Sequence, residues 1–204
     1  MIGQNSLFFL LISLFFISVE PKPKPTLYII GDSTVKTGSG NGENDMWGWG
    51  SVLHHYIDTT KINIENHAIG GRSSRTFITE GRWDNLLPKF KKGDFLLVQF
   101  GHNDESPIND TLRARGTIKG IGDESELIFN MVTKKQETVF SFGHYMRRYA
   151  HEATAKGVNV TLCSPVPRNN FDEEGKIKRP RPFYQDWTRS IAHETKVDFI
   201  NLHE

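Results

Sequence analysis

The 204 residues are 37% hydrophobic and 24% charged, which suits one globular domain with a sizeable core. Lys and Arg number 25 against 24 Asp and Glu, so no strong overall field attracts nucleic acid or a membrane surface. The single cysteine, Cys163, excludes an intrachain disulfide framework and a cysteine-based zinc cluster. Packing must therefore hold the fold, and we expect no nucleic-acid partner.

The first 20 residues differ from the rest of the chain. Residues 7–19, LFFLLISLFFISV, form an apolar run that is short for a membrane span but fits the core of a signal peptide. An uncleaved anchor is the alternative. The following PKPKP, residues 21–25, favours an extended linker. We predict a signal peptide over 1–20, a folded domain over 26–204, a secreted or periplasmic location and no stable membrane span.

Short apolar runs alternate with helical patterns from residue 26 onward. The runs occupy 26–31, 62–69, 94–101, 158–164 and 197–202. Helical spacing covers 48–58, 82–90, 139–156 and 182–194. Nearly continuous apolar runs are typical of strands buried on both faces, and their alternation with helices indicates a parallel sheet. We predict an α/β fold with five parallel strands, in the flavodoxin-like order 2-1-3-4-5.

Two stretches interrupt this alternation. Residues 105–125 are polar and rich in glycine, and they predict a long surface loop. Residues 127–132 and 138–140 could pair as a small hairpin around Lys134 and Lys135. A second insertion, residues 168–181, carries the basic run KIKRPR. Long loops in a compact domain are usually functional.

Polar turns follow the first three predicted strands. They read GDS at 31–33, GGRS at 70–73 and GHND at 101–104. In an open parallel sheet, ligands bind at the carboxyl ends of the strands, near the point where the strand order reverses. With strand 1 between strands 2 and 3, all three turns would meet in one crevice.

These residue types suit acyl transfer. Ser33 could act as a nucleophile, with the Gly71 N–H, the Asn103 amide and its own N–H as donors to an oxyanion. Helix capping is the alternative for the Asp-Ser pair, and each motif alone is a weak signal. Their joint position after three strands favours the catalytic interpretation.

The blocks GDSTV (31–35), NHAIGGRSSRTF (66–77) and QFGHND (99–104) resemble those of the GDSL or SGNH hydrolase superfamily, most closely the rhamnogalacturonan acetylesterase family. The resemblance implies a three-layer α/β/α fold and removal of acetyl groups from pectin-type polysaccharide. It implies Ser33 as nucleophile and Gly71 and Asn103 in the oxyanion hole. It also implies no metal and no organic cofactor, and we expect a monomer at full length.

The sequence departs from the family pattern in one block. The family carries an Asp-x-x-His near its C-terminus, which supplies the general base and the carboxylate that orients it. Asp198 and His203 have the wrong spacing for this pair. We therefore expect a chain truncated after strand 5, without that Asp and His, and inactive as it stands. A carbohydrate-binding protein without turnover and a carbohydrate O-acetyltransferase remain the alternatives.

Substrate contacts are less specific in the sequence. Trp47 could stack on a sugar ring, while Arg75 and the basic segment 176–181 could meet galacturonate carboxylates. His102 neighbours the predicted crevice. Core packing or a solvated charged loop is the alternative for each. His151-Glu152 and His193-Glu194 lack the second histidine of a helical zinc motif, so we expect no metal site there.

Overall fold

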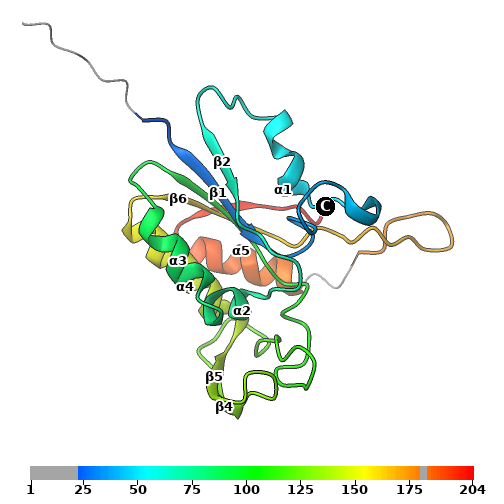
Figure 1. The fold of residues 1–204 in the computed structure, drawn as a ribbon. Helices are drawn as coiled ribbons and strands as arrows, with labels where there is room; N and C mark the ends of the chain where they lie inside the picture. The colour runs from blue at the N-terminus through cyan, green and yellow to red at the C-terminus, as the bar shows by residue number, and fades with distance from the viewer. Residues whose placement is uncertain (1–22, 180–182) are drawn as a thin grey trace, which may run out of the picture.

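Five parallel strands form the centre of the fold in the computed structural model, which describes residues 23–179 and 183–204 (Figure 1). These five strands are β1 (Thr26–Gly31), β2 (Asn63–Asn66), β3 (Phe95–Gln99), β6 (Asn159–Cys163) and β7 (Asp198–Ile200). Two further strands, β4 (Ser125–Phe129) and β5 (Gln136–Phe140), lie outside this sheet. The α-helices are α1 (Trp49–Val52), α2 (Ser74–Thr79), α3 (Arg82–Leu86), α4 (Phe142–Ala155) and α5 (Phe183–Thr195). Short 3₁₀ turns are η1 (Glu43–Asp45), η2 (Leu53–His55) and η3 (Leu87–Lys89).

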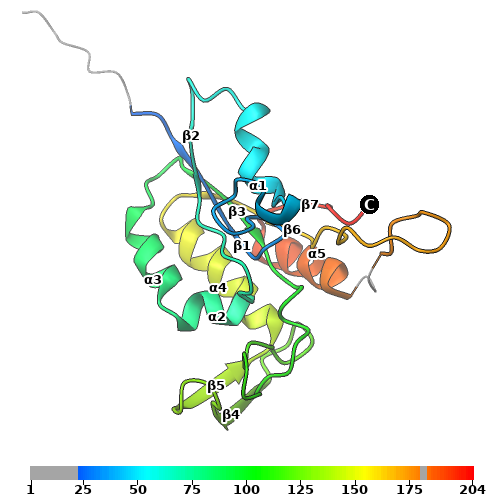
Figure 2. The same cartoon turned by 45° about the vertical axis from the view of Figure 1, so that its right-hand side comes forward.

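The sheet has the order β2-β1-β3-β6-β7. Because β4 and β5 form a separate antiparallel hairpin, this is the predicted 2-1-3-4-5 order of the five sheet strands. Helices α2 to α5 cover one face and α1 lies on the other (Figures 1 and 2). The predicted three-layer α/β/α class is confirmed. The predicted signal peptide lies outside the described residues.

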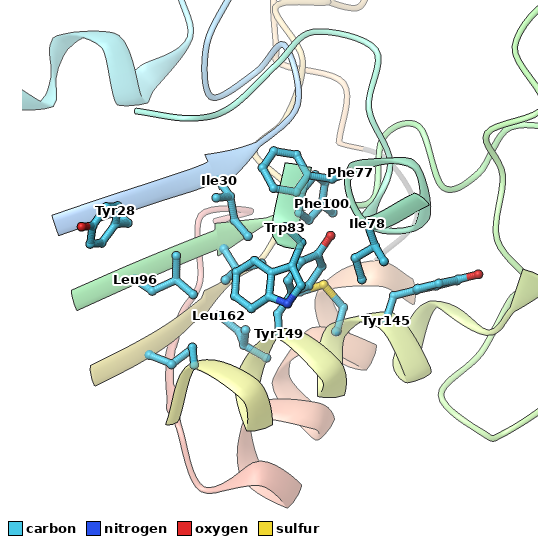
Figure 3. Close-up of a cluster of buried hydrophobic side chains, with 14 of the residues drawn as sticks. Tyr28, Ile30, Phe77, Ile78, Trp83, Leu96, Phe100, Tyr145, Tyr149 and Leu162 are labelled. Carbon is cyan, nitrogen blue, oxygen red and sulfur yellow. The ribbon is translucent and has the colours of Figure 1, made fainter. Parts of the chain in front are cut away.

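Each face of the sheet has its own hydrophobic core, because side chains alternate along a strand. Tyr28 and Ile30 of β1 join Leu96 in a large cluster under the helices α2 to α5 (Figure 3). Leu27 and Ile29 join a smaller cluster on the α1 side. β1 is therefore buried on both faces, as its continuous apolar run predicts. No helix within residues 23–179 and 183–204 is long and apolar enough to cross a bilayer.

The predicted helix over 139–156 begins later in the structure. Val139 belongs to β5, and α4 starts at Phe142. The Ser141 hydroxyl caps this helix by accepting the N–H of His144 (3.1 Å). The predicted hairpin therefore takes the residues that helical spacing alone assigned to α4, and the hairpin itself is confirmed.

The predicted helices over 48–58 and 82–90 are each shorter and end in a 3₁₀ turn. Gly50 lowers helix propensity in the first, and its lack of a side chain lets α1 approach the turn after β1. A Cβ there would lie 3.0 Å from the Val35 carbonyl oxygen. In the second, Pro88 lacks the N–H that would continue α3, so the chain tightens into η3.

The sequence patterns do not predict α2. Its six residues are too few for a clear apolar period, and GGRS is a tight-turn signal. A capping box starts the helix: Ser73 Oγ accepts the Thr76 N–H (3.1 Å), and Thr76 Oγ1 accepts the Ser73 N–H (2.8 Å). This Ser-x-x-Thr spacing is the signal that could have located α2.

Candidate active site

The turns after β1, β2 and β3 lie at one edge of the sheet. Gly31 of β1 is in register with Gln99 of β3. Beyond β2 the chain continues beside β1, where the Ile69 N–H donates to the Gly31 carbonyl (3.0 Å). A methyl group on Gly70 would lie 3.5 Å from the Cβ of Ser33. The topology thus makes the Ser33 turn and the Gly70 turn direct neighbours.

The turn that carries Ser33 is held by Asp32. The Asp32 carboxylate accepts the N–H and the hydroxyl of Thr34, each at 2.8 Å, and closes an Asx turn. The N–H of Val35 donates to the Asp32 carbonyl (3.1 Å). Asp32 is buried, whereas Ser33 is exposed. The turn-forming role belongs to Asp32, which leaves the Ser33 side chain exposed beside the Gly70 turn.

A chain of side-chain hydrogen bonds supports this turn. Trp49 Nε1 donates to Gln99 Oε1 (2.8 Å), and Gln99 Nε2 donates to Thr34 Oγ1 (2.6 Å), which in turn donates to Asp32. Gly31 permits the close approach, because a Cβ there would lie 2.7 Å from the Gln99 carbonyl oxygen. Sequence reasoning missed the support from Gln99, although a glutamine at the end of an apolar strand was an available signal.

Asn103 ties the turn after β3 to the turn after β2. Its Nδ2 donates one of two amide hydrogens to the Arg72 carbonyl (2.8 Å), and the side chain is buried. Gly71 has a φ of 82°, in the left-handed region that favours glycine. The two predicted oxyanion donors, Gly71 and Asn103, therefore lie on turns that are bonded to each other, with the Ser33 turn beside them.

Asp104 locks the same turn to the start of α2. Its Oδ1 accepts the Ser74 N–H (3.1 Å) and the Ser74 hydroxyl (2.5 Å), while the Tyr149 hydroxyl donates to the Ser74 carbonyl (2.7 Å). Burial raises the pKa of Asp104 to about 7 despite the bonds from Ser74, and the Asp32 charge adds to the rise. Sequence reasoning gave Asp104 no role, since a carboxylate at this position reads equally well as a turn residue.

His102 is partly buried beside these turns. Burial lowers its pKa, Arg168 lowers it further, and the Asp32 carboxylate opposes both effects. Its buried Nε2 has no hydrogen-bond partner among the described residues. A role in substrate contact stays a prediction. Across residues 23–179 and 183–204 no group of three His, Cys, Asp or Glu side chains could hold a metal ion.

The two other predicted substrate contacts lie in different surroundings. Arg75 is fully buried: its Nε pairs with Glu137 (2.6 Å), and its Nη1 donates to the carbonyls of Ile108 and Gly116 (2.8 Å each). Its guanidinium therefore links α2 to the insertion and the hairpin and is buried away from solvent. Trp47 is 56% exposed, in the loop before α1, and its sugar contact stays a prediction.

The match to a known family covers the elements that build this site. The model of the GDSL-like lipase/acylhydrolase family matches residues 29–204, from within β1 to the last residue. The chain belongs to this family. The three turns that carry Ser33, Gly71 and Asn103 all fall inside the matched region of this GDSL-like chain.

Relatives of this GDSL-like chain include two enzymes named for one polysaccharide. The rhamnogalacturonan acetylesterase of Emericella nidulans is 31% identical over 177 residues, which are 86% of this chain and 66% of the relative. The rhamnogalacturonan acetylesterase RhgT of Bacillus subtilis is 31% identical over 176 residues, 86% of this chain and 64% of the relative. The chain thus spans about two thirds of the length of these relatives. The predicted resemblance is confirmed.

A solved structure supports the same assignment. The crystal structure of the YxiM protein of Bacillus subtilis aligns with 89% of this GDSL-like chain and 44% of its own, with a TM-score of 0.64 and 27% sequence identity. The arrangement of the sheet and helices is therefore shared with a solved relative.

Proposed function

We propose that the protein is a serine esterase that removes acetyl groups from a pectin-type polysaccharide through an acyl-enzyme on Ser33. The observation that carries this proposal is the junction of three turns at one sheet edge. An exposed serine lies beside a left-handed glycine and an asparagine amide. Proteins of the same family that match most of this chain are named as rhamnogalacturonan acetylesterases, which supports the acetylated substrate.

In the proposed reaction, Ser33 Oγ attacks the acetyl carbonyl carbon and gives up its proton to a histidine general base, the role that the family's Asp-x-x-His block would fill. The carbonyl oxygen becomes an oxyanion, which the N–H groups of Ser33 and Gly71 and the second amide hydrogen of Asn103 would stabilise. The sugar oxygen leaves with a proton, and water then releases acetate from Ser33. The hydrogen bond from Asn103 to the Arg72 carbonyl orients the amide before the charge develops, so no reorganisation is needed.

Export forms part of this proposal. The apolar run over residues 7–19 would direct the protein out of the cytoplasm, where it would meet a pectin-type polysaccharide. A membrane anchor in place of a cleaved leader would serve the same purpose.

Ser33→Ala tests the assignment of the nucleophile. In the protein with the family's Asp-x-x-His block in place, we expect Ser33→Ala to lower acetate release from acetylated rhamnogalacturonan by at least about 1,000-fold, because the hydroxyl that forms the acyl-enzyme is lost. Ser190→Ala, at an exposed serine of α5, is the matched control and should keep its activity. A fluorophosphonate probe followed by mass spectrometry should place a covalent adduct on Ser33. Retained acetate release in Ser33→Ala, or an adduct elsewhere, would overturn the assignment.

A further inference from the structure

Three arginines at the carboxyl edge of the sheet have no acidic partner within the described residues, and Arg179, which also has none, donates to the His203 carbonyl. Most arginines pair with a carboxylate, and these are Arg72, Arg75, Arg82, Arg147, Arg148 and Arg189. Arg113, Arg115 and Arg168 form no ion pair within residues 23–179 and 183–204. They lie in the long insertion after β3 and in the loop after β6, both at the carboxyl edge of the sheet.

Arg115 is held in a fixed orientation against the turn after β2. Its Nε donates to Ser106 Oγ (3.1 Å), and its Nη1 donates to the carbonyl of Gly71 (3.1 Å). These bonds use two of the five guanidinium hydrogens. The others have no partner in the described parts of the chain. A preorganised, partly buried guanidinium with free donors is suited to bind an external anion.

The surface beside Arg115 is hollowed. Arg113 and Arg115 line a hollow of about 370 Å³ together with Asp110. The Asp110 carboxylate accepts the backbone N–H groups of Leu112 and Arg113, each at 2.7 Å, and forms no ion pair with either arginine side chain within the described residues. These bonds also lower the pKa of Asp110. The Asp110 charge thus offsets only one of the two arginine charges that line the hollow.

Arg168 flanks the neighbouring turn. It is exposed, and its Nη2 donates to the carbonyl of His102 (3.4 Å). The pKa of Arg115 is lowered, first by burial and then by the positive charges of Arg113 and Arg168, so these groups lie within electrostatic reach of one another. The three arginines outnumber the two carboxylates that act on Arg115, Asp110 and Asp32, and the remaining positive charge favours binding of an anion from outside.

We propose that Arg115 and Arg168 bind the carboxylate of a uronate ring in the polysaccharide and thereby place the neighbouring acetylated ring over Ser33. This inference rests on the proposed function and narrows its substrate to an acidic chain. Arg-carboxylate pairs are commonly bidentate, and this geometry restricts the orientation of the bound ring and strengthens its binding. The sites that the sequence favoured for this role were Arg75, which is buried and paired, and the basic segment 176–181.

Calorimetric titration tests this site without requiring turnover. The titrants are an oligogalacturonide without acetyl groups and a neutral xylo-oligosaccharide of equal length. We expect Arg115→Gln/Arg168→Gln to raise the Kd for the oligogalacturonide at least about tenfold, and Arg168→Gln alone, at an exposed residue, to raise it about threefold or more. Arg115→Lys keeps the positive charge but loses the two parallel N–H donors of the guanidinium. Its Kd for the oligogalacturonide should therefore lie between those of the double variant and the unmodified protein.

Lys91→Gln/Lys92→Gln removes two charges at exposed positions before β3, at the opposite end of the strands from the site turns, and is the matched control. Its Kd for the oligogalacturonide should stay within about twofold. The proposal is overturned if the unmodified protein does not bind the oligogalacturonide more tightly than the neutral oligosaccharide. It is also overturned if the arginine variants bind as the unmodified protein does, or if the lysine control loses as much affinity. Failure of the Ser33 experiments with arginine-dependent binding intact would overturn only the esterase function.

Discussion

Asp104 is a carboxyl group that the fold keeps from water at the centre of the candidate site. Its position is set by Ser74, whose N–H and hydroxyl both bond to it, and by the Asn103 turn that precedes it. Burial raises its pKa to about 7, so near neutral pH the group changes charge. The residue that fixes the distance between α2 and the turn after β3 is therefore also sensitive to pH.

The Asp104→Asn variant should change how stability depends on pH. The folded protein holds a proton on Asp104 up to about pH 7, whereas the unfolded chain loses it near the ordinary value of 3.8. The native state therefore binds more protons in this window, and the free energy of unfolding should fall as pH rises from about 4 to about 7. The fall from this residue is on the order of 4 kcal/mol. Asparagine cannot titrate, so urea denaturation of the variant should show a flatter profile.

Asp198→Asn provides the control for this experiment. Asp198 is exposed at the start of β7, and its substitution should leave the slope of the pH profile unchanged. A slope in Asp104→Asn as steep as in the unmodified protein would show that another group is responsible.

Short elements around the site depend on tertiary partners for their stability. Helix α2 has six residues, too few to be stable alone, and the buried Arg75 links it to β5 and to the insertion. The pairing of Arg75 with Glu137 places two opposite charges 2.6 Å apart, and the buried Arg75 Nη2 has no hydrogen-bond partner among the described residues. Removing one partner would leave a desolvated charge, which costs more than the pair contributes.

Arg75→Met should lower the free energy of unfolding by about 3 kcal/mol, because Glu137 and the carbonyls of Ile108 and Gly116 would lose their partner. Glu137→Gln should also lower the free energy of unfolding, because the buried Arg75 charge loses its counter-ion, although an amide oxygen can still accept the Arg75 Nε hydrogen. The double variant should cost less than the sum of the two, as measured by urea denaturation.

Lys61→Met is the surface control for the Arg75 and Glu137 variants. Lys61 pairs with Asp58 at 3.3 Å on the exterior, and its loss should change the free energy of unfolding by no more than about 0.5 kcal/mol. Strict additivity of Arg75→Met and Glu137→Gln would show that the two side chains do not interact in solution.

At the scale of the whole molecule, stability is unequal between the sheet and the hairpin. The strand β3 pairs on both sides, and its Leu96 and Val98 are fully buried. The hairpin has two strands, and Leu127 and Phe129 of β4 are 66% and 55% exposed. A two-stranded hairpin with few buried side chains is marginally stable by itself.

Hydrogen exchange should therefore separate the two regions. We expect amides of residues 125–129 and 136–140 to exchange through local opening, at least about 100-fold faster than those of residues 95–99, which should require global unfolding. Mass spectrometry of peptic peptides measures both in one experiment, with β1 as an internal reference. Equal protection of hairpin and sheet would contradict this ranking.

The buried strands were predictable because a strand that is buried on both faces is a nearly continuous apolar run in the sequence. The run over 26–31 is apolar on both faces, and β1 has those bounds in the structure. Helix bounds were less predictable because local contacts override spacing: Ser141 starts α4, Pro88 ends α3, and the capping box at Ser73 starts α2. The three site turns could be located because glycine and polar residues interrupt apolar runs at the strand ends.

The sequence by itself determined the class of fold and the positions of the three turns that form the candidate site. These follow from local patterns of apolar residues, glycines and polar residues, which act within a few residues of the chain. Only the tertiary structure decided which charged groups are free to bind a ligand. Arg75 and Arg115 look alike in the sequence, yet one is buried against Glu137 and the other faces a hollow beside Gly71. Pairing and burial depend on residues distant along the chain, so no local pattern records them.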